Sequence, residues 1–340
     1  MTDALLPDRH PIPDFFVCDV FDAAPKGDMA SMEHPIFALS TRPDITVREY
    51  EHRDVKVMVT PSVKGLATVH DRDVLIYCIS QIIRALNDGR KVSKAVRFQA
   101  SDMLKATNRM TTGRHYDLLR ASLERLRGTT ISTNIVTGGQ QVFRTFGLIE
   151  SAEIVRETYE GRMQEIEIVL SDWVFNAIQA KEVLTLSRDY FRLRKPLERR
   201  LYELARKHCG MQREWRIGLE LLQKKCGSSS HVNRFRHSIK QIIDEDQESA
   251  HMPDYTIRLS EDGQTVFFAS RGTVPTDASD THDIPELDAD VYEMAREAAP
   301  GWDPRYIEQE WRMWAKEMPK NPEMAFLGFC KKWFERRGRP

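Results

Sequence analysis

The sequence has no long hydrophobic run, few cysteines and no common enzyme motif. Its longest apolar stretch, residues 74–79 (VLIYCI), is far shorter than the roughly 18 residues that a membrane-spanning helix needs. The five cysteines are scattered, odd in number and without a CxxC pair, which predicts reduced thiols in a cytoplasm. The acidic N-terminus carries no apolar signal segment. We therefore expect a cytosolic protein that does not associate with membranes.

Signatures of catalysis are also missing. No GxxxxGK[ST] motif is present, which argues against a P-loop ATPase, and no His-x-His pair is present to hold the metal of a rolling-circle nickase. Tyr190 and Tyr202 are interpreted as packing residues, and Asp71 with Asp73 as the start of a helix. The sequence predicts neither an enzyme nor a cofactor. A relaxase-type nicking enzyme stays open as an alternative, which a tyrosine–DNA adduct would reveal.

A zinc site is the one metal centre that the sequence suggests. His208, Cys209, Cys226 and His231 lie in one short stretch of the chain. Their spacing matches no standard zinc finger, so no metal is predicted.

The formal net charge of -1 conceals strongly segregated charges. Residues 84–131 hold eleven Lys/Arg against four Asp/Glu, a net of +7, and residues 187–245 hold fifteen against seven, a net of +8. Residues 1–35 carry seven acids and two bases, and residues 272–310 carry eleven acids and two bases. Two basic blocks indicate two surfaces for a polyanion, although solvated basic helices would give the same count.

The first basic block lies in a succession of helices followed by strands. Hydrophobic spacing and turn signals predict helices over 71–87, 98–105 and 111–127, strands over 129–136 and 141–149 around a turn at 137–139, and a strand over 165–170. This order of helix, helix, tight turn, helix and hairpin is typical of a winged helix-turn-helix.

The same order recurs in the second basic block. The predicted elements are helices 196–208, 219–225 and 231–244, a short strand 215–217, and a hairpin of strands 254–259 and 265–269. The third helix of each block has an apolar stripe with the same +3, +4, +3 spacing: Tyr116, Leu119, Leu123 and Leu126 in one, and Val232, Phe235, Ile239 and Ile242 in the other. We interpret the two blocks as an internal repeat.

The predicted fold is α+β, with two tandem winged helix-turn-helix domains and a small all-α unit. The proposed divisions are a flexible tail over 1–35, a first winged-helix domain over 36–186, a second over 187–272, an acidic linker over 273–287 and a C-terminal three-helix unit over 288–340. Asp303-Pro304 and Asn321-Pro322 each provide an N-cap followed by proline at the first helical position, which starts two of the three helices.

The helix after the turn of a winged helix-turn-helix lies in the DNA major groove, where Arg can read guanine and Asn can read adenine. Hydroxyl groups and amides at helix starts can hold phosphate. On this basis, the candidate DNA-binding residues in the first block and its hairpin are Arg109, Thr111, Thr112, Arg114, His115, Arg120 and Arg144. Those in the second are Ser228, Ser229, Ser230, His231, Asn233, Arg234, Arg236, His237, Lys240 and Arg258.

Aromatic residues are concentrated in the C-terminal unit. Trp311, Trp314, Phe326, Phe329 and Trp333 have helical spacing and are expected to pack a small core. An alternative stays open, in which some of them stack on single-stranded bases or dock a partner protein. The candidate residues for such a contact are Trp311, Trp314, Lys331, Lys332 and Trp333.

Several unbroken strings of the sequence resemble the plasmid replication initiator protein A family. They are residues 34–40 (HPIFALS), 60–68 (TPSVKGLAT), 71–81 (DRDVLIYCISQ), 126–135 (LRGTTISTNI), 170–173 (LSDW) and 190–210 (YFRLRKPLERRLYELARKHCG). The resemblance covers about 34–272. The C-terminal unit is similar to a module attached to some replication and helicase-loading proteins.

The resemblance implies a bacterial initiator that binds repeated origin sites, called iterons, in double-stranded DNA and begins plasmid replication. It implies that the second domain makes most base-specific contacts and that the first adds backbone contacts and dimerisation. It also implies self-repression and monomer and dimer states, origin melting, and recruitment of the host helicase, its loader or the host initiator. The alternative is a dimeric transcriptional repressor that never melts DNA.

Overall fold

The computed structural model describes residues 5–10, 35–40, 42–52, 55–133, 136–137, 140–141, 144–157, 163–179, 185–209, 213–272, 287, 289–315, 319 and 321–338. The chain forms two compact units, residues 1–275 and 276–340, each with its own hydrophobic core. The predicted hairpin turn at 138–139 and nearly all of the predicted linker lie outside the described residues. No helix in the described part of the chain is long and apolar enough to cross a membrane.

The first basic block forms three helices and a three-stranded antiparallel sheet. Its elements are α1 (Arg72–Asn87), β3 (Ala95–Gln99), α2 (Ala100–Ala106), α3 (Gly113–Gly128), β8 (Ile149–Glu157) and β9 (Met163–Leu170). The sheet has the order β3-β9-β8. The helix α4 (Asp172–Gln179) and the 3-10 helix η2 (Arg188–Arg192) then lead to the second block.

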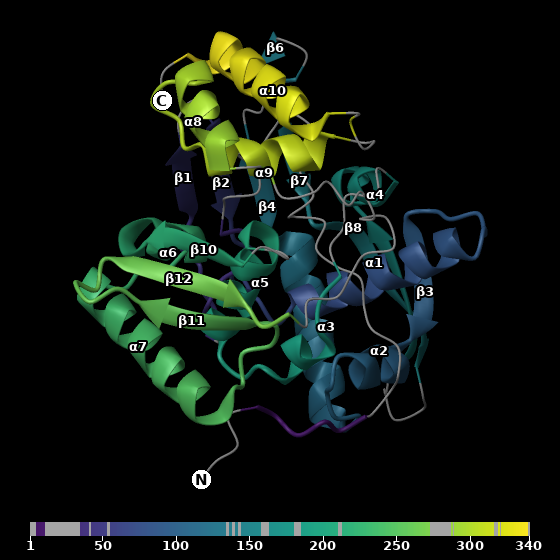
Figure 1. Cartoon of the computed structure of the whole chain (residues 1–340). Helices are drawn as coiled ribbons and strands as arrows, with labels where there is room; N and C mark the ends of the chain where they lie inside the picture. Colours follow the sequence, from purple (N-terminus) through teal and green to yellow (C-terminus); the bar gives the residue numbers. More distant parts are fainter. Residues whose placement is uncertain are drawn as a thin grey trace. The chain divides into compact units, whose positions relative to one another are not determined.

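The second basic block repeats this arrangement element by element (Figure 1). Its elements are α5 (Pro196–His208), β10 (Glu214–Gly218), α6 (Leu219–Cys226), α7 (Val232–Ser249), β11 (Tyr255–Leu259) and β12 (Thr265–Ser270). The sheet order β10-β12-β11 corresponds strand for strand to β3-β9-β8. The internal repeat predicted from the sequence is therefore present in the topology.

The two matched helices, α3 and α7, bury the same positions of their apolar stripes. Leu119, Leu123 and Leu126 are buried in α3, as Phe235, Ile239 and Ile242 are in α7. The first member of each stripe, Tyr116 or Val232, is half-buried at the start of its helix. The remaining face of each helix is left to solvent, as the helical spacing predicts.

The hairpin predicted from strands 129–136 and 141–149 is present, but it belongs to another sheet, so its assignment as the hairpin of the first winged-helix block was wrong. Strands β4 (Thr130–Thr133) and β7 (Arg144–Gly147) pair with each other and, through β4, with β2 (Val55–Thr60) and β1 (Arg48–His52), in the order β1-β2-β4-β7. The short strands β5 (Val136–Thr137) and β6 (Gln140–Gln141) lie between them in the chain. The counterpart of the β11–β12 hairpin is β8–β9, and Arg144 lies outside it.

The two repeats share one hydrophobic core across the predicted domain border at 186–187. Side chains from both sides of the border, including Ile76, Leu104, Leu186, Tyr190 and Tyr202, are buried in the same cluster. Turn and charge signals mark repeats in a sequence, but they do not reveal whether the repeats pack against each other. The first unit of the structure is therefore a single body.

Part of the predicted flexible tail is bound to this body. Residues 5–10 run over the surface, where Leu6 exchanges hydrogen bonds with Arg192 and Leu5 packs against the core. The prediction of a loose tail was therefore wrong for these six residues. Residues 11–34 lie outside the described part of the chain.

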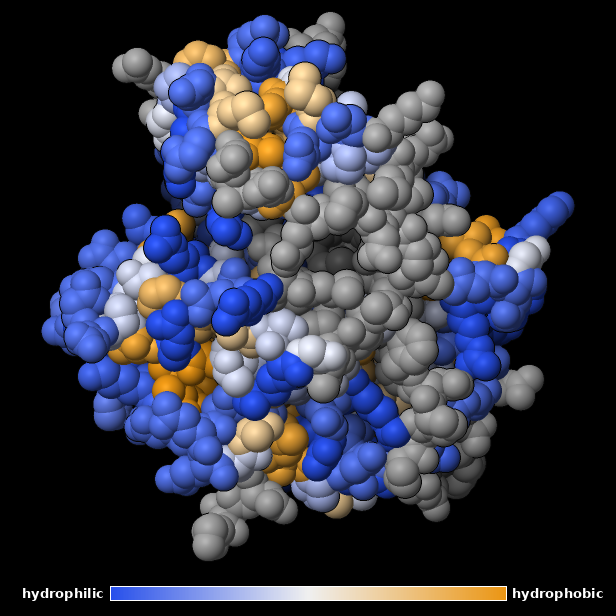
Figure 2. Space-filling view, in the orientation of Figure 1, coloured by the Kyte–Doolittle hydropathy of each residue, from blue (hydrophilic) through white to orange (hydrophobic). Residues whose placement is uncertain are grey.

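The C-terminal unit consists of α8 (Ala289–Ala298), α9 (Pro304–Trp314) and α10 (Pro322–Arg337). Both predicted N-caps are present, because the side chains of Asp303 and Asn321 accept hydrogen bonds from backbone amides of the first turn. Trp311 and Phe326 are buried in its core, as expected. Hydrophobic side chains also reach the surface of this unit (Figure 2).

Candidate nucleic-acid interface

Helix α7 presents the clearest cationic face of the second repeat. Its apolar side is fixed by Phe235 and Ile239, and α7 runs beside the β11–β12 hairpin (Figure 1). The solvent side begins in the first turn of the helix and exposes Asn233, Arg234, His237 and Lys240. Within the described part of the chain, no carboxylate lies within ion-pair distance of Arg234 or Lys240. Figure 2 shows a predominantly hydrophilic surface over this helix.

The serines at 228–230 precede α7 and are predicted from the sequence to supply its N-cap, but another residue caps the helix. The His231 Nδ1 accepts the backbone N–H of Asn233 at 3.3 Å, so His231 is the N-cap. Ser228 and Ser230 share a hydroxyl–hydroxyl hydrogen bond of 2.9 Å in the preceding turn, and Ser229 is exposed. The expected serine caps were therefore wrong, because Gly227 ends α6 in a left-handed conformation and the serines form the turn itself.

Arg236 and Arg258, two of the predicted DNA-binding residues, have partners within the protein. The Arg236 guanidinium donates to the Gly263 carbonyl at 3.1 Å and to the Asn233 side chain at 2.9 Å, so it ties α7 to the turn of the β11–β12 hairpin. Arg258 pairs with Glu214 at 2.7 Å and lies 3.6 Å from the centre of the Phe267 ring. We interpret Arg236 as a residue that holds Asn233 in place.

Helix α3 also presents cationic side chains to solvent. Arg114 and Arg120 are exposed, as are Thr111 and Thr112 before the helix. His115 is half-buried and shares a hydrogen bond of 2.8 Å with the Thr112 hydroxyl. Burial and then the charges of Arg109, Arg9 and Arg114 lower the pKa of His115, which keeps its imidazole neutral at pH 7.

Arg109 belongs to a buried network of ion pairs that connects the two repeats. Asp73 of α1, 1% exposed, accepts from Arg109 at 2.7 Å and from Arg199 of α5 at 2.7 Å. Although burial alone would raise the pKa of Asp73, the charges of Arg199 and Arg109 hold it below its usual value. Buried Asp73 thus engages the Arg109 guanidinium within the protein, and a contact of Arg109 with DNA stays a prediction.

Two further carboxylates extend this network. Asp71 accepts hydrogen bonds from the Ser122 hydroxyl at 2.6 Å and from Nε and Nη2 of Arg125, each at 2.7 Å. These bonds tie the start of α1 to α3. Glu203 of α5 accepts the Tyr190 hydroxyl at 2.6 Å and pairs with Arg72. Asp71 and Asp73 were predicted to mark the start of a helix, as acidic residues of its first turn. Their main partners instead come from other segments, which local spacing could not indicate.

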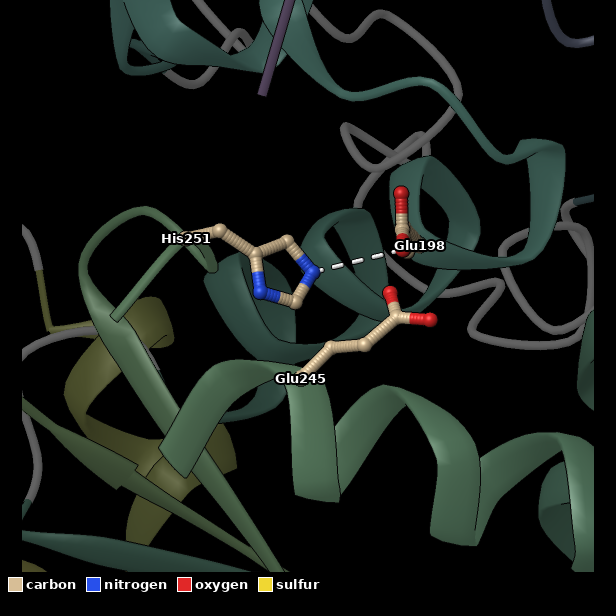
Figure 3. Close-up of side chains that lie close together, drawn as sticks. All are labelled: Glu198, Glu245 and His251. Atoms are coloured by element: carbon tan, nitrogen blue, oxygen red, sulfur yellow. Dashed lines mark hydrogen bonds and ion pairs between the residues drawn. The ribbon is translucent and has the colours of Figure 1, made fainter. Parts of the chain in front are cut away.

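Glu198, Glu245 and His251 are the one group in the described residues whose ligand atoms could hold a metal ion (Figure 3). Glu198 comes from α5 and Glu245 from α7, whereas His251 follows α7. The Lys195 ammonium lies 2.6 Å from Glu245 and 3.5 Å from Glu198, so a cationic side chain already contacts both carboxylates. The group therefore does not fit a metal, and we interpret it as an ion-pair cluster that joins α5 to α7.

This cluster predicts a specific pH dependence of stability. Burial opposes the charged imidazole of His251, but Glu198, at 3.3 Å, raises its pKa above 6.5. The pKa of His251 is therefore higher in the folded protein than in the unfolded protein. The stabilisation by the His251–Glu198 pair is complete below the unfolded pKa and is lost as the pH rises through the folded pKa. Glu198 has a lowered pKa, so its own contribution is lost as the pH falls below 4.5 through the folded pKa.

We expect the His251→Gln variant to lose this decline of the unfolding free energy above pH 6.5. Urea unfolding between pH 5 and pH 9 measures it. A wild-type protein and a variant with parallel pH profiles would contradict the assignment.

Three of the four residues considered for zinc pack into the second repeat, whereas His231 is exposed at the start of α7. His208 stacks on Trp215 with ring centres 4.7 Å apart, and the Cys209 thiol donates to the Phe268 carbonyl. Burial raises the pKa of Cys226 to about 12 and that of Cys209 to about 11. In the described part of the chain, the ligand atoms of these four residues do not converge on one point, so they do not form a zinc site.

Only one of the three candidate tryptophans of the C-terminal unit is exposed. Trp314 exposes 63% of its surface and lies 5.6 Å from Phe329, whereas Trp311 and Trp333 are 1% and 7% exposed. The prediction that Trp311 and Trp333 contact a partner was therefore wrong, because both complete the three-helix core. Lys331 and Lys332 are exposed on α10.

Comparison with known proteins identifies the family. Residues 26–257 match the model of the family described as "Replication initiator protein A", which covers more than half of the chain. The chain therefore belongs to this family of replication initiators.

One relative from Wigglesworthia glossinidia brevipalpis, described as "Putative replication protein", is 37% identical over 265 residues, which are 76% of this chain and 94% of the relative. Two crystal structures of domains 2 and 3 of RctB are also similar. They have 15% and 13% identity and TM-scores of 0.48 and 0.49, and they cover 68% and 70% of this chain and 92% and 95% of their own.

Proposed function

We propose that this replication initiator binds repeated sites in duplex origin DNA through two winged helix-turn-helix units. In this proposal, α3 and α7 are the helices that enter the major groove, and α7 makes most of the base contacts. The observation that carries the proposal is the exposed face of α7. Asn233, Arg234 and Lys240 are all exposed on this helix, and its opposite face is buried.

The chemistry of this face suits a base edge. An arginine side chain can donate two hydrogen bonds to guanine, and an asparagine can pair with adenine. Arg234 and Asn233 lie in the first turn of α7, the part of a recognition helix that usually meets the bases. Lys240 lies further along the helix, where a phosphate contact is expected.

Initiation itself would follow from binding at several adjacent sites. Each bound copy bends its DNA, and the accumulated deformation lowers the cost of melting a neighbouring AT-rich segment. The C-terminal unit, which has its own core, would then engage the host helicase or its loader, with Trp314 as the exposed aromatic contact. Self-association and repression of its own gene belong to the same proposal.

The experiment that tests this function is footprinting of the full-length protein on the DNA that flanks its gene. The expected result is protection of several directly repeated sites beside an AT-rich stretch, followed by permanganate reactivity in that stretch as DNA opens. Protection of a single inverted repeat without opening would favour a repressor. Absence of any preferred site would contradict the proposal.

Deletion of residues 288–340 should separate the two activities. Because the first unit has its own core, we expect this variant to keep the wild-type footprint and to lose plasmid replication. Origin affinity and plasmid copy number are the two measurements. If the truncated protein still maintains the wild-type copy number, the C-terminal unit is not the part that recruits the helicase.

A further inference from the structure

The N-terminal residues 5–10 contact two parts of the first unit that are far apart in the sequence. At one end, Leu6 exchanges hydrogen bonds of 2.9 and 2.8 Å with Arg192, in η2. At the other end, the Arg9 amide donates to the Asn108 side chain at 2.8 Å, and the Asn108 side chain donates to the Pro7 carbonyl at 3.1 Å. This segment lies outside residues 26–257, the part of the chain that matches the family model.

The loop that receives this segment leads directly into α3. Asn108 has a positive φ of 57°, a conformation that asparagine tolerates better than most residues. The Arg9 guanidinium donates to the Asn108 carbonyl at 2.9 Å, and the His10 ring shares a hydrogen bond of 2.9 Å with the Arg109 carbonyl. The segment thus holds the backbone four and five residues before the first helical residue, Gly113.

This attachment also gathers positive charge at the start of α3. Burial, and then the charges of Arg109, Arg9 and Arg114, disfavour protonation of His115. Among the described residues, Asp73 engages Arg109, and Asp8 is 3.3 Å from Arg188. Arg9 and Arg114 therefore both contribute positive potential near His115, which would attract a neighbouring anion.

We propose that residues 5–10 are an arm of the DNA interface, in which Arg9 contacts a backbone phosphate beside the α3 helix. This inference rests on the proposed function, because it assigns α3 to duplex DNA. A segment that served only to hold the loop could do so through the backbone of Arg9 and the side chain of Asn108. The guanidinium of Arg9 uses one of its five N–H donors on the Asn108 carbonyl, which leaves others for a phosphate.

The test measures the affinity of the full-length protein for its footprinted duplex and for a random duplex of equal length, across a range of salt concentrations. For Arg9→Gln we expect weaker binding to both duplexes by the same factor. The slope of log K against log salt should become shallower by about 0.9, the value for one lost phosphate contact. Arg9→Lys should keep the wild-type slope.

Arg90→Gln is the matched control, because Arg90 is an exposed arginine paired with Asp88 beyond the end of α1. It removes one charge and should leave the slope unchanged. Urea unfolding of each variant verifies that the fold is intact.

The other results overturn the arm, the proposed function, or both. An unchanged slope for Arg9→Gln, with loss on the footprinted duplex alone, would reduce residues 5–10 to a support for α3. Equal effects of Arg9→Gln and Arg9→Lys would exclude charge as the cause. If the wild-type protein prefers no duplex but Arg9→Gln still flattens the slope on random DNA, the proposed function fails and the arm stands. A wild-type protein that binds no duplex overturns both.

Discussion

Replacing Arg234 with alanine should weaken binding to the footprinted site by about 1–3 kcal/mol and leave binding to random DNA nearly unchanged. The Arg234 side chain is exposed in the first turn of α7 and has no ion-pair partner in the described residues. Its loss should therefore remove a base contact without disturbing the fold. Equilibrium binding at fixed salt measures both affinities, and substitution of each base pair in the site locates the contact.

Lys240→Ala is the comparison for this variant, because Lys240 is exposed on the same helix in the position expected for a phosphate. It should weaken binding to all duplexes alike. An Arg234→Ala variant that behaves in the same way would assign Arg234 to a phosphate. Arg236→Ala should differ from both, since it also frees the hairpin turn at Gly263.

Replacing Asp73 with alanine should lower the free energy of unfolding by about 3–5 kcal/mol, the usual effect of removing one partner from a buried ion pair. Asp73 is 1% exposed and faces Arg199, which is 3% exposed. Without the carboxylate, the Arg199 guanidinium would stay buried beside the positive charge of Arg109. Urea unfolding followed by circular dichroism measures the change.

The control for this variant is Asp88→Ala, which breaks the exposed pair of Asp88 with Arg90 and should cost less than about 1 kcal/mol. An Asp73→Ala protein as stable as this control would contradict the importance of the network. The lowered pKa of Asp73 predicts in addition that its contribution is lost at acid pH, below the unfolded value of 3.8.

Helix boundaries could be predicted well where the chain carries local signals. Helix α5 has the predicted bounds of 196–208, because Pro196 starts it and Glu198 returns to the Lys195 amide. Helix α7 continues past the predicted end at 244 to Ser249, where Ala250 takes the left-handed conformation that glycine usually supplies. The sequence has no glycine there, and so it gave no signal for the end of the helix.

Pairing between strands that are far apart in the chain, and the partners of buried charges, could not be predicted. The β-branched residues 129–136 indicate strands, but the contact between Ile131 and Val59 that defines their sheet joins positions far apart in the chain. Similarly, Asp73 and Arg199 are 126 residues apart, and nothing near either of them identifies the other. Periodicity depends on near neighbours, whereas these contacts depend on the tertiary fold.

In the candidate interface, too, features set by local spacing could be predicted and contacts between distant segments could not. Exposure of Arg114, Arg234 and Lys240 follows from the helical spacing of the apolar stripes, so the sequence was sufficient for them. The internal partners of Arg109 and Arg236 come from α1 and from the β11–β12 turn. Basic composition alone does not distinguish an arginine held by the protein from one that is available to DNA.

The core that the two repeats share would fix the spacing between the two half-sites in the proposed DNA complex. Two modules joined by a loose tether would tolerate extra base pairs between their half-sites, but α3 and α7 are parts of one body and cannot rotate independently. Inserting about five base pairs, half a turn of B-DNA, would move one half-site to the opposite face of the duplex. In the proposed complex, binding would then depend on the helical phase between the two half-sites as well as on their bases.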